Sequence, residues 1–208
     1  MEKGNTKSEI LNTALELFST QGFEATSVSQ IADAVGIRKA SLYSHFESKQ
    51  AILDALVKRV LEEYEKKSVL AAYKRQSGGG VYPETCDEVV RVVKSQLTYI
   101  LHDPFISKAR KMLTIEQFRN AELAILQTKQ NYSDVMRYFT DLMAFLKERG
   151  VIGGGDPEMM AAQFCLPITV WISLCDREPK RETEVMELVD KHIRQFFATY
   201  GCGLKGEK

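Results

Sequence analysis

The chain has 208 residues, of which 44% are hydrophobic and 27% charged, a composition typical of a globular protein with a sizeable core. Its 28 Lys and Arg residues balance 28 Asp and Glu residues, which excludes a protein that coats nucleic acid through bulk positive charge but not one with a local basic face. Four scattered cysteines without metal-ligand spacing, no signal-peptide pattern and no run of ~18 uncharged apolar residues argue against a metal site, a disulfide framework and a membrane span, and they predict a cytoplasmic protein.

The first predicted helix runs from about Thr6 to Thr20, and residues 1–6 before it are expected to be disordered. Gly22 is expected to end this helix, and Lys7 near its start is a candidate phosphate contact. Its apolar residues recur at helical spacing, which suits a helix that covers the elements that follow. They are Ile10, Leu11, Ala14, Leu17 and Phe18.

Residues 26–49 predict two short helices joined by a tight turn. Thr26 or Ser27 can cap the first of them by accepting a backbone N–H. Gly36 suits the left-handed residue that ends it. The apolar residues of this helix lie at offsets 0, 3, 4 and 7, on one face: Val28, Ile31, Ala32 and Val35.

The second short helix follows Ile37, and its Ala40, Tyr43 and Phe46 are expected to face the core. Two short helices with a glycine in the turn form a helix-turn-helix signature, in which the second helix enters the major groove of DNA. A plain helical hairpin with a solvated polar face is the alternative that this spacing leaves open. The solvent side of the second helix carries donors for phosphates and base edges, namely Arg38, Lys39, Ser41, Ser44 and His45.

Residues 10–56 resemble the DNA-binding domain of the TetR/AcrR regulators. The matching segments are ILNTALELF (10–18), GFEATSVSQIADAVGI (22–37) and ASLYSHFESKQAIL (40–53). The rest of the chain resembles this family in length, helical character and helix order. The resemblance implies an all-α fold of about nine helices, with a three-helix, homeodomain-like helix-turn-helix domain over residues 5–65 and a helical ligand-binding and dimerisation domain over residues 66–202.

The resemblance also implies roles for single side chains. Tyr43, His45 and Lys49 match family positions that contact the DNA backbone. Thr26 and Ser27 lie at a helix N-terminus, which suits phosphate binding. The candidates for reading bases are Arg38, Lys39, Ser41 and Ser44, with Ala40 among them on the same helix.

The remaining chain reads as a series of helices separated by breaks. Ser48 is expected to cap a long helix that has no breaker before Ser77 and that can act as a lever into the second domain. The glycine-rich segment 74–84 predicts a flexible corner. Thr114 is expected to cap a later helix. Helices are predicted over 84–101, 104–113, 114–123, onward to about Arg149, 156–176 and 182–200.

The two C-terminal helices are the most apolar. Residues 160–175 are almost uncharged, so their helix must be buried on several faces, and Pro167 should kink it. In TetR-like proteins the last two helices pair with their copies, so the resemblance implies a homodimer through residues 156–176 and 182–200. A two-fold dimer presents its recognition helices about one DNA turn or a multiple apart, and a near-palindromic double-stranded operator is therefore expected.

Aromatic and methionine side chains of the middle helices have two interpretations. For any single residue, a place in the hydrophobic core is favoured. The resemblance implies instead a pocket for a small apolar or aromatic ligand, whose binding shifts the protein to a conformation with lower operator affinity. The candidate lining residues are Tyr99, His102, Phe105, Met112, Phe118, Phe139, Met143, Phe164 and Trp171.

The function that these features predict is a ligand-responsive transcriptional repressor. A transcriptional activator of the same fold, or a helical small-molecule-binding protein without a DNA function, are the alternatives. No enzyme, cofactor or metal is expected, because His45, His102 and His192 form no triad or metal spacing and neither a phosphate loop nor a nucleophile elbow occurs.

Overall fold

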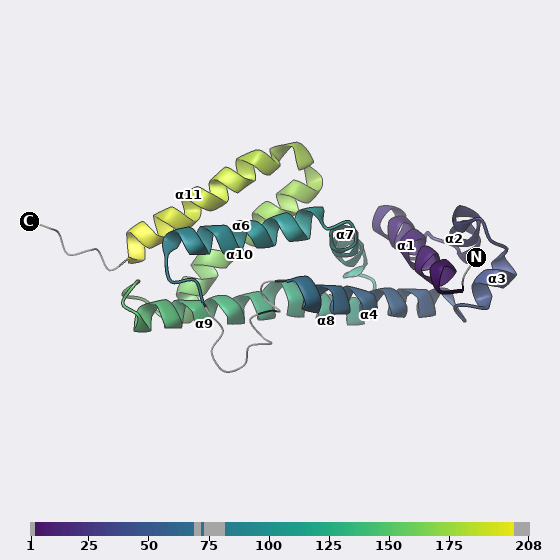
Figure 1. The fold of residues 1–208 in the computed structure, drawn as a ribbon, viewed down its shortest axis with the longest axis horizontal. Coiled ribbons are helices and arrows are strands. Elements are labelled where there is room, and N and C mark those ends of the chain that lie inside the picture. Colours follow the sequence, from purple (N-terminus) through teal and green to yellow (C-terminus); the bar gives the residue numbers. More distant parts are fainter. Residues whose placement is uncertain (1–2, 69–71, 73–81, 202–208) are drawn as a thin grey trace, which may run out of the picture. The chain divides into compact units, whose positions relative to one another are not determined.

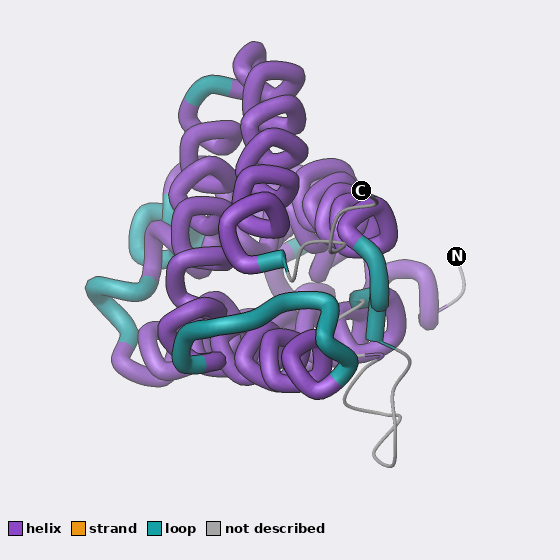
Figure 2. Tube along the Cα trace, turned by 90° about the vertical axis from the view of Figure 1, so that its left-hand side faces the viewer, coloured by secondary structure: helices purple, strands orange, loops and turns teal. Residues whose placement is uncertain are grey.

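The computed structural model describes residues 3–68, 72 and 82–201. The fold is all-α, as the sequence predicts (Figure 1 and Figure 2). The helices in chain order are α1 (Lys3–Gln21), α2 (Val28–Val35), α3 (Lys39–Tyr43), α4 (Lys49–Lys67), α6 (Cys86–His102), α7 (Ile106–Glu116), α8 (Ala121–Thr128), α9 (Asp134–Glu148), α10 (Pro157–Arg177) and α11 (Glu182–Tyr200). A π-helical turn, η1 (Lys129–Ser133), joins α8 to α9, and a 3-10 turn, η2 (Pro179–Arg181), precedes α11.

Two compact units make up the chain, and neither is one stretch of sequence. The N-terminal unit combines Met1–Lys67 with His102–Gln127, and the C-terminal unit combines Ser68–Leu101 with Thr128–Lys208. The chain first passes from the N-terminal to the C-terminal unit after Lys67, near the expected domain boundary at residues 65 and 66. However, it returns to the N-terminal unit for α7 and α8, so one boundary is not enough to divide the sequence into the two units.

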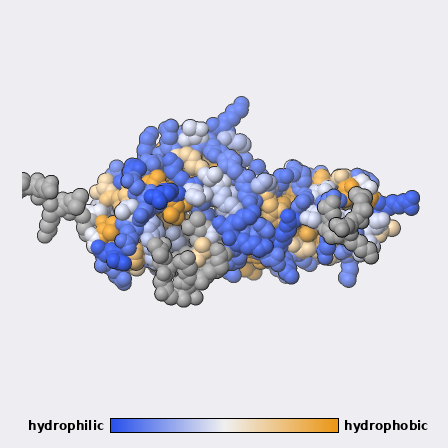
Figure 3. Space-filling view, viewed as in Figure 1, coloured by the Kyte–Doolittle hydropathy of each residue, from blue (hydrophilic) through white to orange (hydrophobic). Residues whose placement is uncertain are grey.

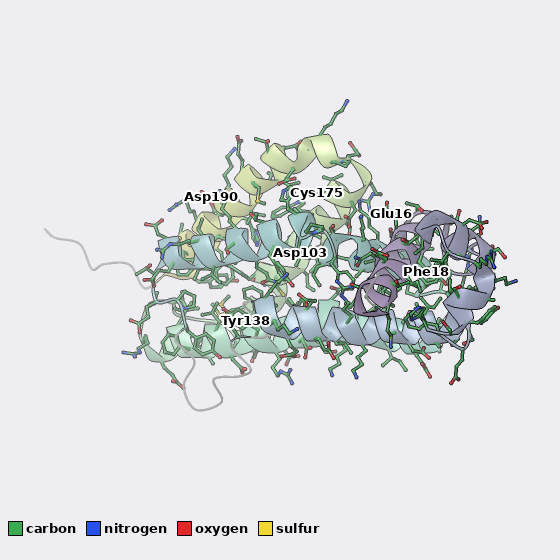
Figure 4. All side chains as sticks on the ribbon, turned by 45° about the vertical axis from the view of Figure 1, so that its right-hand side comes forward. Glu16, Phe18, Asp103, Tyr138, Cys175 and Asp190 are labelled. Atoms are coloured by element: carbon green, nitrogen blue, oxygen red, sulfur yellow. The ribbon has the colours of Figure 1, made fainter. Side chains whose placement is uncertain are left out.

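Helix α1 is the centre of the N-terminal unit and packs against α2, α4 and α7. It begins at Lys3, so residues 3–6 are helical and not disordered as expected. Leu17 is half-buried, and Leu15 takes the core position beside Ala14. The buried side chains of α1 are Ile10, Leu11, Ala14, Leu15 and Phe18, the last labelled in Figure 4.

The predicted ends of α2 are confirmed. Ser27 caps it, because its Oγ accepts the Gln30 N–H at 3.1 Å while the Gln30 Oε1 accepts the Ser27 N–H at 2.7 Å. Gly36 ends it with φ of 77°, in the left-handed region that glycine adopts at least cost. Ile31 and Ala32 are buried on the predicted face.

The start of α4 is also as predicted, because the Ser48 Oγ accepts the Ala51 N–H at 3.0 Å. The helix ends at Lys67. Its expected continuation to Ser77 and residues 74–81 of the predicted glycine-rich corner lie outside the described residues.

The boundary between α7 and α8 differs from the prediction. Thr114 lies inside α7, and its hydroxyl donates to the Arg110 carbonyl at 2.9 Å instead of capping a new helix. Asn120 is the capping residue, since its Oδ1 accepts the N–H groups of Glu122 and Leu123 at 3.0 and 3.1 Å. Thr and Asn both cap helices, and the sequence alone favoured the wrong one.

An aromatic cluster fills the core of the C-terminal unit, in which α9 and α11 pack against α10. Phe164 of α10 lies at its centre. Its ring centroid is 5.0 Å from that of Phe139 on α9 and 5.1 Å from that of Phe196 on α11. Tyr138 extends the cluster with an edge-to-face contact to Phe139, also at 5.0 Å.

Helix α10 carries the predicted proline in its interior. Asp156 caps the helix through the Met159 N–H at 3.0 Å, before Pro167 interrupts the ladder of backbone hydrogen bonds. The His192 Nε2 of α11 lies 2.8 Å from the Phe164 carbonyl, so this nitrogen carries the proton of the hydrogen bond. A side chain of α11 thus contacts the backbone of α10 within one turn of the proline.

Helix α10 is also long and apolar enough to cross a membrane by length and composition, with a mean hydropathy of 1.4. One such helix is weak evidence for a span, because the core helix of a water-soluble protein passes the same test. Figure 3 shows hydrophobic residues in small patches among hydrophilic ones on the face that it draws.

Asp103 links the end of α4 to the start of α7 within the N-terminal unit (Figure 4). Its Oδ1 accepts the N–H groups of Phe105 and Ile106 at 3.0 Å each, and its Oδ2 pairs with the Lys67 ammonium at 3.0 Å. Burial opposes ionisation of this carboxyl, but the hydrogen bonds from Ile106, Lys67 and Phe105 outweigh it and lower its pKa from 3.8.

Asp103→Ala is expected to lower the free energy of unfolding by about 1 kcal/mol at pH 7, the usual loss for a helix cap. Since folding lowers this pKa, the stabilisation by the ionised carboxylate is present above about pH 3.8 and is lost as the pH falls through the folded value. Urea unfolding followed by circular dichroism should therefore give a smaller gap between the two proteins at pH 3. Asp33→Ala, at an exposed carboxylate, is the control, and an equal gap at both pH values would contradict the assignment.

Candidate nucleic-acid interface

Helix α3 has five residues and is held by Leu42, whose side chain is fully buried in the hydrophobic core of the N-terminal unit. Phe46, just beyond the helix, is buried as predicted. Ala40 and Tyr43 are exposed, so the prediction that they face the core is wrong. The core-facing residue is Leu42, which turns Ala40 and Tyr43 toward solvent together with the polar side chains.

The outward face of α3 has the polar character that the sequence predicts. Tyr43 is 45% exposed, a large fraction for an aromatic side chain. The Ser44 hydroxyl donates to the Ser41 carbonyl at 2.7 Å and keeps its acceptor lone pairs. His45 is half-buried at the edge of this face. The exposed candidates are Arg38, Lys39, Ala40, Ser41, Tyr43 and Ser44.

Thr26 and Ser27 have different surroundings. The Thr26 side chain is buried, with its hydroxyl donating to the Gly22 carbonyl at 2.7 Å and accepting from the Gln21 amide at 3.0 Å. This hydroxyl is therefore withdrawn as a candidate phosphate ligand. Ser27 is exposed at the N-terminus of α2 and remains a candidate.

The charges around this face are mixed. Lys7 of α1 lies over the Phe46 ring, 5.2 Å from its centroid, and so brings a cation next to the end of α3. Glu24, Asp33 and Glu47 are exposed nearby in the sequence and reduce the local positive charge. Few cationic side chains on this surface can therefore contact phosphates.

Lys49 makes internal contacts that the sequence did not predict. Its ammonium donates to the Phe23 carbonyl at 2.7 Å and lies 4.2 Å from the centroid of the Phe23 ring. The side chain is half-buried. Lys49 therefore fixes the loop between α1 and α2, a role separate from the contact with the DNA backbone that the family resemblance implies.

The candidate ligand-lining residues are divided between the two units. His102, Phe105, Met112 and Phe118 belong to the N-terminal unit, whereas Tyr99, Phe139, Met143, Phe164 and Trp171 belong to the C-terminal unit. Phe118 is 88% exposed and lies outside both hydrophobic cores, so its assignment to a buried lining is wrong. Met112, Phe139, Met143 and Phe164 are buried core residues, which agrees with the plain interpretation of these positions.

The predicted dimerisation helices match α10 and α11. On α10, apolar side chains remain exposed along one stripe at spacings of seven and four residues: Met159 (59%), Leu166 (36%) and Val170 (62%). The opposite face of the helix is buried in the core of the unit. This helix thus has a second apolar face that the chain does not cover within its own C-terminal unit.

The described residues contain no cluster of side chains suited to bind a metal ion. Among residues 3–68, 72 and 82–201, no group of three or more His, Cys, Asp or Glu side chains is arranged to hold an ion. Burial raises the pKa of the Cys165 thiol to about 11, so this thiol stays protonated near neutral pH and is a poor ligand.

Sequence reasoning missed two buried residues of the N-terminal unit, one on α3 and one on α7. Leu42 was missed because a five-residue helix is too short for its apolar period to be read. Glu116 was missed although a signal existed, because it continues the buried stripe of α7, where Ala109, Met112 and Leu113 precede it at helical spacing. A carboxylate at the next core position of such a stripe indicates a buried polar contact.

The arrangement of α2, Gly36 and α3, with one buried anchor and an exposed polar face, defines the class of helix-turn-helix proteins. Residues 10–56 match the family described as bacterial regulatory proteins, tetR family. The chain is 41% identical over 61 residues to the HTH-type transcriptional repressor KstR2 of Rhodococcus jostii (strain RHA1), covering 29% of this chain and 30% of that protein. It is 46% identical over 52 residues to IcaR of Staphylococcus aureus (strain Newman), the biofilm operon icaADBC HTH-type negative transcriptional regulator, covering 25% of this chain and 28% of that one.

The matched segments span less than a third of the length of each of these two relatives. A similarity that extends over the whole chain is found only when three-dimensional structures are compared. A TetR-family transcriptional regulator from Agrobacterium tumefaciens superimposes with a TM-score of 0.65 at 17% identity, covering 96% of this chain and 100% of that one. Residues 10–56 thus match the tetR family of bacterial regulatory proteins, and the chain as a whole shares its fold with that TetR-family structure.

Leu42→Ala is expected to destabilise the N-terminal unit by about 2–5 kcal/mol, the usual range for a large-to-small substitution at a fully buried position. Urea unfolding followed by circular dichroism measures this loss. Ala40→Ser on the exposed side of the same helix should change the unfolding free energy by less than about 0.5 kcal/mol. Similar small effects from both substitutions would mean that α3 is not anchored through Leu42.

Proposed function

We propose that the chain is a sequence-specific DNA-binding transcriptional regulator that acts as a homodimer and represses by occupying a near-palindromic operator. The observation that carries this proposal is the exposed polar face of α3, which is held outward by the buried Leu42. A helix anchored on one side and polar on the other can enter the major groove without disturbing the fold.

The exposed side chains divide by their reach and chemistry. Arg38, Lys39 and Ser41 are assigned to base edges, since guanidinium, ammonium and hydroxyl groups match the donor and acceptor pattern of the major groove. Tyr43 and Ser27 are assigned to phosphates. Ser44 and His45, at the end of α3, and the backbone of Ala40 complete the surface that would face DNA.

The exposed stripe of α10 supports the homodimer. Met159, Leu166 and Val170 leave an apolar strip in water, and pairing with the same strip of a second copy would bury it. This pairing with α11 beside it gives the four-helix interface that the family resemblance implies, and it explains why α10 is as apolar as a membrane span.

Repression and a response to a small ligand are the finer parts of the proposal. The two relatives named above are described as a repressor and a negative regulator, which favours repression over activation here. The aromatic cluster around Phe139, Phe164 and Trp171 is the candidate region for an apolar or aromatic ligand in the C-terminal unit. A ligand that binds one conformation better than another would shift the population away from the DNA-binding form.

Selection of bound DNA from a random pool by the purified protein is the test of the proposed function. An enriched inverted repeat is expected for the wild type, because a two-fold dimer presents two recognition helices. The enrichment should be lost with Tyr43→Ala and kept with Tyr132→Ala, a matched change at a tyrosine of similar exposure outside the interface. If the wild type enriches no sequence, the proposed function is wrong.

Val170→Asp is expected to convert a dimer into a monomer at micromolar concentration, because it places a charge in the proposed apolar interface. Sedimentation velocity measures the change. Ile125→Asp is the matched control, since it introduces the same group at another exposed β-branched residue, on α8. A wild-type protein that sediments as a monomer at this concentration would refute the homodimer.

A further inference from the structure

The backbone of Phe23, in the loop between α1 and α2, is held from two sides by charged side chains of distant helices. Its N–H donates to the Glu116 Oε1 of α7 at 2.8 Å. Its carbonyl accepts from the Lys49 ammonium of α4 at 2.7 Å. The carboxylate therefore binds the N–H of the Gly22–Phe23 peptide group, and the ammonium binds the carbonyl of the next one, Phe23–Glu24, so both contacts are charge-assisted hydrogen bonds.

The ring of Phe23 is fixed as well. It makes an edge-to-face contact with the Phe18 ring at 5.2 Å, and the Lys49 ammonium lies over its face. Glu116 itself is 2% exposed, which makes this hydrogen bond costly to lose. Both backbone polar groups of Phe23 are thus engaged within the N-terminal unit.

Gly22 provides the space for this arrangement. It is buried, and a Cβ on it would stand 3.1 Å from the Glu116 Oε1 and 3.5 Å from the Ile115 Cγ2. Its φ of 87° is in the left-handed region that other residues rarely adopt. The carboxylate can approach the loop because this position has no side chain.

The backbone of Phe23, which Glu116 and Lys49 hold, is close to the start of α2. The Thr26 N–H donates to the Phe23 carbonyl at 3.2 Å, and the Thr26 hydroxyl donates to the Gly22 carbonyl. The next residue, Ser27, is the cap of α2. The place where α2 begins is therefore tied through four residues to a carboxylate on α7 and an ammonium on α4.

We propose that Glu116 and Lys49 are a pair of positioning residues for DNA recognition, which clamp the backbone N–H and carbonyl of Phe23 and thereby hold α2 and α3 in the arrangement that binds the operator. This inference rests on the proposed function and deepens it. It gives Lys49 a role inside the protein, in contrast to the phosphate contact that the family resemblance implies for this position. It also assigns a role in DNA binding to α7, a helix outside the helix-turn-helix sequence.

The test uses the purified protein, the inverted repeat selected by the wild type and an unrelated duplex of equal length. The variants are Glu116→Ala, Glu116→Gln, Lys49→Met and the double variant Glu116→Ala with Lys49→Met. Glu116→Gln keeps an oxygen acceptor for the Phe23 N–H and guards against the chance that the alanine variant does not fold. Glu65→Ala and Lys58→Met remove the same charges at exposed positions of α4 and are the controls.

Glu116→Ala and Lys49→Met should each weaken operator binding by about tenfold, because the unclamped loop leaves only a fraction of molecules competent to bind. Binding to the unrelated duplex and the slope of log affinity against log salt should not change, since neither residue would contact a phosphate. Glu116→Gln should restore most of the operator affinity. The double variant should lose less than the product of the single losses, because both residues hold the backbone of Phe23. Hydrogen exchange should accelerate at residues 22–26 in the alanine variant while α10 stays protected.

Three results would overturn the proposal. If Lys49→Met lowers the salt slope by about 0.9 and weakens both duplexes alike, Lys49 is a phosphate contact. If the losses in the double variant multiply, the two residues act independently. If folded Glu116→Ala binds the operator like the wild type, Glu116 positions nothing needed for DNA. In each of these cases the wild type still selects an operator, so the proposed function stands. A wild type that selects no operator would contradict both the proposed function and the positioning role of Glu116 and Lys49.

Discussion

Helix α3 cannot exist by itself. Five residues make little more than one helical turn, far below the length at which an isolated helix is stable in water. Its conformation depends on the burial of Leu42 against a core that α1, α2, α4 and α7 build together. The polar face that would meet DNA is therefore a product of tertiary packing, and everything that stabilises the N-terminal core also holds that face in place.

Local signals in the sequence predicted the local structure well. The capping box of Ser27, the left-handed Gly36 and the cap at Ser48 are set by a few adjacent residues, and all three were correct. The inward face of α3 was predicted wrongly, because a single turn contains no apolar period from which to read its phase. The exposed Phe118 was also misjudged, since a bulky apolar residue looks the same in a sequence whether its site is buried or not.

Long-range relations were beyond the reach of such signals. The return of α7 and α8 to the N-terminal unit and the contact of Glu116 with the Phe23 N–H, 93 residues away, depend on the path of the whole chain. The same holds for Lys49. Its place in the family pattern suggested an outward role, and the structure adds an inward one that only the fold reveals.

Charge is used sparingly on the candidate interface. With Lys49 engaged with a carbonyl and with acidic side chains exposed nearby, each subunit offers only modest attraction for the DNA backbone. Pairing two subunits would double the number of phosphate and base contacts at one site. A neutral chain paired in this way would rely on geometry more than on bulk charge, which would favour discrimination between sequences over retention on any DNA.

The discontinuous N-terminal unit limits how this protein can be recombined with others. A chimera cut after α4 would carry the helix-turn-helix without α7, and so would leave the core side chains of α1 without Ala109, Met112 and Leu113 and the Phe23 N–H without its acceptor. A transferable N-terminal unit must therefore include His102–Gln127 as a second piece. Evolution faces the same restriction, so exchange of the C-terminal unit between relatives would be expected to preserve α7 and α8 with their partner helices, although they lie far along the chain.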